Sequence, residues 1–129
     1  MKKMFIFLST VLLSTAVFAA EPPPAEREMQ VGVNSVYVPG SFDSNSEAYV
    51  VVNGVFQNGC YKWKRAEVTN TDTFNHEVKA IAAVTQGMCI MVLVPYQNDV
   101  RLGKLAAGEH TLRFLSGDGT YLEKKLTIE

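Results

Sequence analysis

Apolar and polar residues alternate with a period of two along most of the chain from residue 29 onward. Such alternation places apolar side chains on one face of a β-strand and polar side chains on the other. Short segments of this kind, separated by turn-forming residues at spacings of about ten residues, are typical of a β-sandwich. The sequence therefore predicts an all-β fold, a single antiparallel sandwich of about seven to nine strands. The expected strands cover residues 29–38, 49–56, 60–64, 66–69, 78–85, 88–94, 110–114 and 122–128.

Three of these segments carry additional signals. The apolar residues of the first change parity at Asn34-Ser35, as expected for a bulge or for a strand that crosses between sheets. This segment is also the most favourable candidate for a sheet edge. In the second, Asn53-Gly54 indicates either a hairpin or a bulge. Residues 88–94 are apolar on both faces, which predicts a central buried strand that Pro95 ends.

The first nineteen residues have the layout of a secretory signal peptide. A short basic start is followed by an apolar stretch over residues 5–18, and small side chains stand near residue 19. The predicted organisation is a cleaved signal helix over 1–19, a proline-containing tail over 20–27 and a sandwich domain over 28–129. The expected location is periplasmic or secreted. No other apolar run approaches the length of a membrane-spanning helix, so no membrane span is expected after processing.

Charge narrows the range of partners. Lys2 and Lys3 belong to the predicted signal peptide, so 10 of the 12 basic residues remain against 13 acidic ones, a net charge of −3. The basic residues are not clustered. Nucleic acid and anionic lipid both attract basic patches, so neither is an expected partner.

Cys60 and Cys89 form an even pair in a chain that is predicted to be exported, which favours a disulfide. The alternative is a metal or thiol site, for which the chain offers only His76 and His110. The parity of His110 indicates a partly buried strand end, and His76 stands in a polar, turn-like setting. No catalytic triad or nucleophile motif is visible. The sequence therefore predicts no enzyme activity, no cofactor and no metal ligands.

Three stretches, over residues 58–61, 88–95 and 102–114, resemble small secreted bacterial immunoglobulin-like β-sandwich domains of uncharacterised function. The resemblance covers roughly residues 48–128. It implies that the two cysteines pair and that the third stretch forms a loop leading into a late strand, and it implies no activity. Trp63 follows Cys60 by only three residues, unlike the arrangement in antibody domains. The bridge is therefore expected to connect neighbouring strands or a loop.

These observations favour an exported, non-catalytic binding or structural module of the cell envelope or the extracellular space. The alternative is an inhibitor of a secreted or periplasmic enzyme, with the hairpin at residues 116–121 as its tip. The partner would be a protein or a glycan, because exposed aromatic rings stack on sugars and anchor protein interfaces. The candidate contact residues are Tyr61 and Trp63 on one strand face, Asp43 in a polar loop, and Asp118 and Tyr121 in the hairpin. For Trp63 the alternative is a position in the core.

Overall fold

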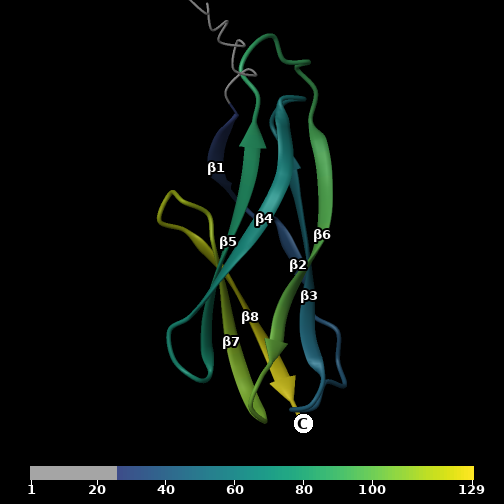
Figure 1. The fold of residues 1–129 in the computed structure, drawn as a ribbon, viewed down its shortest axis with the longest axis vertical. Coiled ribbons are helices and arrows are strands. Elements are labelled where there is room, and N and C mark those ends of the chain that lie inside the picture. The colour runs from purple at the N-terminus through teal and green to yellow at the C-terminus, as the bar shows by residue number, and fades with distance from the viewer. Residues whose placement is uncertain (1–25) are drawn as a thin grey trace, which may run out of the picture.

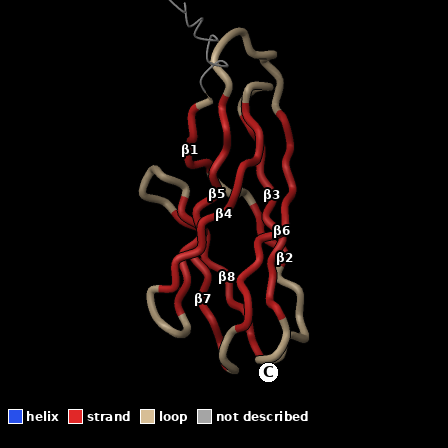
Figure 2. Tube along the Cα trace, in the orientation of Figure 1, coloured by secondary structure: helices blue, strands red, loops and turns tan. Residues whose placement is uncertain are grey.

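The computed structural model describes residues 26–129, and its regular structure consists of strands alone (Figures 1 and 2). The predicted signal peptide and residues 20–25 of the predicted tail lie outside the described residues. The strands are β1 (Arg27–Val31), β2 (Ser35–Tyr37), β3 (Glu47–Phe56), β4 (Tyr61–Asn70), β5 (Asn75–Val84), β6 (Val94–Lys104), β7 (Gly108–Leu115) and β8 (Tyr121–Ile128). The predicted all-β sandwich is confirmed.

Two sheets form the sandwich. The larger contains β1, β4, β5, β7 and β8, and the smaller has the order β2-β3-β6. Strand β5 is the central strand of the larger sheet. It pairs with β4 along its length, with β1 near its end and with β7 near its start. The pairing of β5 with β7 is parallel, whereas the other strand pairs are antiparallel.

The predicted first strand is divided between the two sheets. Its first part is β1 in the larger sheet, and its second part is β2 in the smaller sheet. The change of parity at Asn34-Ser35 therefore marks a crossing between sheets, which is one of the two expected possibilities. Two hydrogen bonds hold the crossing, from Tyr96 Oη to the Gly32 carbonyl at 2.6 Å and from Asn34 N to the Asn53 carbonyl at 2.8 Å. Each half has a single partner strand and so lies at a sheet edge.

The core lies between the sheets and is built from the alternating inward positions of their strands. The largest fully buried apolar side chains come from both sheets, and the burial of each stabilises the folded state by about 1.5–3 kcal/mol. These side chains are Val50, Val52, Val78, Leu112, Phe114 and Leu126.

The Asn53-Gly54 pair forms neither a hairpin nor a bulge, because it lies within the continuous strand β3. The side chain of Tyr96 covers Gly54 so closely that a β-carbon there would overlap two ring carbons and the hydroxyl oxygen of Tyr96. The glycine is therefore required by packing, and the irregularity of β3 lies elsewhere, between Ala48 and Tyr49.

The prediction of a central buried strand over residues 88–94 is wrong. Residues 85–93 form the connection from β5 to β6, and β6 begins only at Val94, opposite Phe56 at the end of β3. Residues 88–93 extend beyond the end of β3 and have no strand to pair with. Pro95 lies inside β6, which is an edge strand of the smaller sheet, and it does not end the preceding segment.

Candidate functional site

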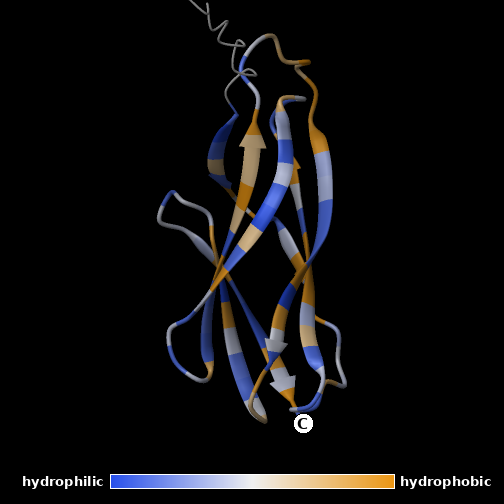
Figure 3. Ribbon diagram, viewed as in Figure 1, coloured by the Kyte–Doolittle hydropathy of each residue, from blue (hydrophilic) through white to orange (hydrophobic). Residues whose placement is uncertain are grey.

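The most unusual surface of the described domain is the loop that replaces the expected strand. Residues 88–93, which we call the apolar loop, carry no charged residue and project from one end of the long axis (Figure 3). The exposed fractions of its apolar side chains run from 51% for Val92 to 104% for Met88. The other exposed apolar side chains of the loop are Ile90, Met91 and Leu93. A contiguous exposed apolar patch of this kind marks an interaction site more often than a single exposed residue does.

A disulfide fixes the apolar loop to the rest of the domain. Cys89 in the loop is bonded to Cys60, which directly precedes β4, and their Cα atoms are 5.3 Å apart. The predicted pairing is therefore present, and it connects a strand start to a loop. The amide of Gly59 also donates to the Ile90 carbonyl at 2.9 Å, and the Thr85 amide donates to the Cys60 carbonyl at 3.1 Å. The loop is thus held at several points although its side chains face solvent.

A shallow depression of about 300 Å³ lies beside this end of the sandwich. It is bounded by β1, the end of β3 and the start of β4, with Met29, Val55 and Tyr61 in its lining. The hydroxyl of Tyr61 lies 2.5 Å from Gln57 Nε2 and 3.8 Å from Met29 Sδ. The lining combines these side chains with polar ones, including Gln30 and Gln57.

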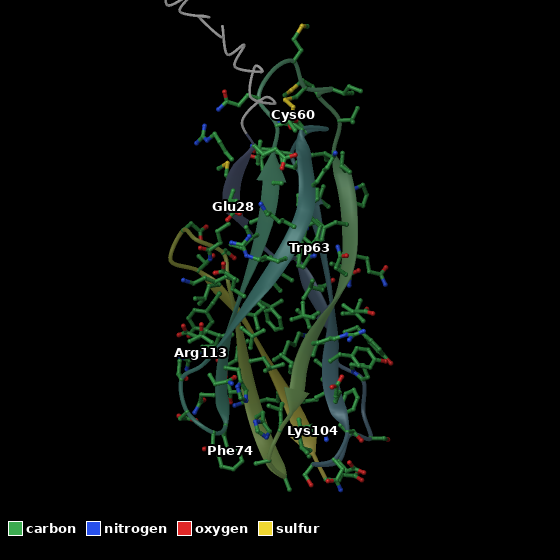
Figure 4. All side chains as sticks on the ribbon, viewed as in Figure 1. Glu28, Cys60, Trp63, Phe74, Lys104 and Arg113 are labelled. Carbon is green, nitrogen blue, oxygen red and sulfur yellow. A yellow bond between two sulfur atoms is a disulfide. The ribbon has the colours of Figure 1, made fainter. Side chains whose placement is uncertain are left out.

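Tyr61 and Trp63, two of the predicted contact residues, are half-buried and pack on the core side of β4. The Tyr61 ring stacks on Phe56 with centroids 5.8 Å apart, and the Trp63 ring lies 5.5 Å from that of Tyr96. The stacked rings of Phe56 and Tyr61 support the end of the sandwich that carries the apolar loop. Figure 4 shows Trp63 in the middle of the long axis and Cys60 near the end.

The predicted contact residues Asp43, Asp118 and Tyr121 lie away from the apolar loop. Asp43 Oδ1 accepts hydrogen bonds from the Asn45 amide and the Ser46 hydroxyl, and these lower the pKa of its carboxyl. Asp118 Oδ1 accepts from the hydroxyl and the amide of Thr120, with the same effect on its pKa. Both carboxylates therefore close their own turns.

The hairpin between β7 and β8 presents Tyr121, which is 53% exposed. The guanidinium of Arg113 lies over its ring, 5.3 Å from the centroid. A cation placed over an aromatic ring is attracted by the negative face of the ring. The structure thus brings together Asp118 and Tyr121 in one hairpin, whereas it separates them from Asp43, Tyr61 and Trp63.

An ionic cluster that the sequence did not indicate connects β1 with β4. Arg65 donates to both oxygens of Glu28, at 3.0 and 2.7 Å, and Lys64 lies 2.8 Å from the same carboxylate. The hydrogen bonds from Arg65, followed by the contact with Lys64, lower the pKa of Glu28 to about 2. The cluster is exposed and therefore fixes geometry more than it adds stability.

The two histidines form a buried pair, contrary to the predicted solvated setting of His76 and partly buried setting of His110. Their exposed fractions are 3% and 0%. His76 has the same parity as Val78 and Ala80, whose side chains point into the core. This shared parity was the feature of the sequence that could have predicted the burial of His76. Burial, followed by the proximity of His110, lowers the pKa of His76. Within residues 26–129, no group of three or more His, Cys, Asp or Glu residues is placed to hold a metal ion.

The described residues also include no helix with the length and apolar character needed to cross a membrane.

Comparison with known proteins identifies the family. The family model described as the ORF11 beta-sandwich domain matches residues 50–128, from β3 to the end of β8. No curated protein and no solved structure matches the chain significantly. The matched region contains both cysteines, the apolar loop and the histidine pair. The chain therefore belongs to the ORF11 β-sandwich domain family.

Proposed function

We propose that this protein is an exported, non-catalytic binding module of the cell envelope or the extracellular space, and that it contacts its partner through the apolar loop. One observation carries the proposal: five exposed apolar side chains stand on a loop of six residues that a disulfide ties to the sandwich. Leaving these side chains in water is unfavourable, and a partner that covers them recovers that free energy.

The disulfide supports an oxidising location, because such bonds persist in the periplasm and outside the cell. The predicted signal peptide at residues 1–19 supports the same location. The structural roles of several groups that could otherwise act as catalysts support the proposal of a non-catalytic module. The two cysteines are bonded to each other, the two histidines hydrogen-bond to each other, and Asp43 and Asp118 cap their own turns.

A second candidate function is inhibition of a secreted or periplasmic enzyme through the hairpin between β7 and β8. The observation in its favour is the exposed Tyr121 ring, which Arg113 holds in place. The turn itself is closed by Asp118 and by the Ser116 amide, which donates to the Thr120 carbonyl at 3.0 Å. A fixed hairpin with one exposed aromatic ring is a reasonable shape for entering an enzyme cleft.

Site-specific photo-crosslinking in intact cells separates the two candidates. A photoactivatable residue replaces Met91 in one variant and Tyr121 in a matched variant. We expect an adduct with an envelope component from position 91 and much less from position 121. Crosslinking from position 121 alone, together with inhibition of a lysozyme or protease by the purified protein, would favour the inhibitor. The absence of adducts at position 91 would overturn the proposed contact surface.

A further inference from the structure

The residue types of the apolar loop are those that lipid accepts most readily. The loop presents methionine and aliphatic side chains only, with no tryptophan, tyrosine or arginine among residues 88–93. The residues that dominate protein interfaces are enriched in those three absent types, and leucine and valine are under-represented among them, whereas methionine is common at such interfaces. The loop projects from one end of the domain (Figure 3), and each of its five apolar side chains is at least half exposed.

The preceding polypeptide enters the domain at the same end as the loop. Arg27 at the start of β1 pairs with Val84, the last residue of β5 before the connection that contains the loop. Residues 19–25 separate Glu26 from the apolar stretch at residues 5–18. A chain of this length spans at most about 28 Å. While the predicted signal peptide is inserted in a membrane during export, the end of the domain that carries the loop therefore stays within reach of that membrane.

Electrostatics adds little to contact with a bilayer. Arg27 and Lys62 lie opposite the last two residues of β5, and neither makes an ion pair within residues 26–129. The predicted mature chain nevertheless has a net charge of −3. Attraction to an anionic surface is therefore weak, and the apolar side chains must provide most of the binding free energy.

The backbone of the loop limits the depth of insertion. The Ile90 carbonyl accepts hydrogen bonds from the amides of Gly59 and Val92, both at 2.9 Å. An irregular loop contains further backbone groups that need water or lipid headgroups as partners, because the hydrocarbon core provides none. The loop is therefore suited to the boundary between headgroups and acyl chains, the depth at which amphipathic segments bind.

Resting on the proposed function, we propose that the occupant of the apolar loop is a lipid bilayer surface, which the domain binds peripherally and largely independently of headgroup charge. The long axis of the sandwich then stands away from the bilayer. The ends that carry Phe74 and Lys104, opposite Cys60 in Figure 4, point toward the surrounding medium.

Vesicle sedimentation of the processed, disulfide-bonded protein tests this proposal. The probes are vesicles of phosphatidylcholine alone and vesicles that also contain anionic phosphatidylglycerol. We expect partitioning onto both, with a change of less than about threefold between low and high salt. Ile90→Asp and Met91→Asp should each reduce partitioning by about tenfold or more, because a charged side chain replaces an apolar one that the bilayer would cover. Tyr37→Asp, which alters an exposed aromatic residue of β2, should leave partitioning unchanged.

Three results would overturn the bilayer as occupant: no partitioning onto either vesicle, partitioning that requires anionic lipid and disappears with salt, or partitioning that the loop variants do not alter. The crosslinking experiment distinguishes this failure from failure of the proposed function. Adducts between position 91 and an envelope protein, without vesicle binding, would retain the binding module and replace lipid by that protein. Unchanged circular dichroism of the loop variants serves as the control for folding.

Discussion

His76 and His110 hydrogen-bond directly to each other, with His76 Nε2 lying 2.8 Å from His110 Nδ1. At the two ends of this pair, His110 Nε2 lies 2.6 Å from the Ala106 carbonyl and His76 Nδ1 lies 2.6 Å from Asn70 Oδ1. A carbonyl only accepts, so His110 Nε2 carries a proton. In a neutral pair, His76 Nε2 then donates to His110 Nδ1, and His76 Nδ1 must accept.

Asn70 decides which protonation state fits this chain of hydrogen bonds. When its amide NH₂ group faces His76, every group is satisfied and both rings are neutral. When its oxygen faces His76, the chain requires one additional proton, and the pair is a cation. The side-chain rotation of Asn70 is therefore coupled to proton binding in the buried pair. Because burial lowers the pKa of His76, we assign the neutral form to neutral pH.

The first prediction concerns stability as a function of pH. The pKa of His76 is lower in the folded protein than its ordinary value of about 6.5, so the unfolded chain binds more protons between these two values. The contribution to stability is complete above about pH 6.5 and decreases as the pH falls. Denaturant unfolding between pH 8 and pH 5 should show a falling midpoint.

The carboxylates identified above do not obscure this window, because the pKa values of Glu28, Asp43 and Asp118 are lowered. Nuclear magnetic resonance measures the titration of His76 directly. The imidazole of His76 should titrate below pH 6.5 and the Asn70 side-chain amide signals should shift with it. Titration of His76 at or above 6.5 would contradict the assignment of a neutral pair.

The second prediction concerns the disulfide. It closes a loop of about 30 residues, and replacing both Cys60 and Cys89 by serine should lower the free energy of unfolding by about 3.6 kcal/mol in the chain-entropy account. Chemical denaturation of the oxidised protein and the double variant measures the difference. Thiol labelling of the denatured, unreduced protein should find no free thiol, and two labelled cysteines would reject the pairing.

The third prediction concerns Gly54. A β-carbon at this position overlaps the ring of Tyr96, so Gly54→Ala must displace the ring and weaken its hydrogen bond to the Gly32 carbonyl. We expect a loss of about 1–3 kcal/mol in the free energy of unfolding, as for other overpacked cores. Gly40→Ala is the matched control, because a β-carbon at residue 40 meets no atom within 4 Å. Equal unfolding free energies for the two variants would exclude close packing at Gly54.

The fourth prediction separates the role of the apolar loop from that of the core. Met91→Ser should change the free energy of unfolding by no more than about 0.5 kcal/mol, because the side chain of Met91 is exposed. Phe114→Ala, by contrast, should cost about 3–5 kcal/mol, because Phe114 is fully buried. Thermal or chemical unfolding measures both. A large loss of stability from Met91→Ser would show that the loop belongs to the core instead of forming a surface for a partner.

The sequence by itself determined the strands whose apolar residues alternate. A strand has only two faces, and one face of each must meet the core, so Leu112 and Phe114 in β7 and Leu126 and Ile128 in β8 could be assigned from parity alone. The change of parity at Asn34-Ser35 indicated either a bulge or a crossing between sheets, because one residue out of register turns every later side chain to the opposite face. The placement of β1 and β2 in different sheets decided for the crossing. The pairing of the cysteines followed from their even number and from the predicted oxidising compartment.

Only the tertiary structure decided the character of residues 88–93 and the environment of the histidines. A run of apolar residues has the same pattern in a buried strand and in an exposed loop, and the difference is whether a neighbouring strand is available to pair with it. Here β3 ends at Phe56, so the run before Val94 lies beyond the sheet and remains exposed. His76 and His110 are 34 residues apart, and only the parallel pairing of β5 with β7 brings their rings together.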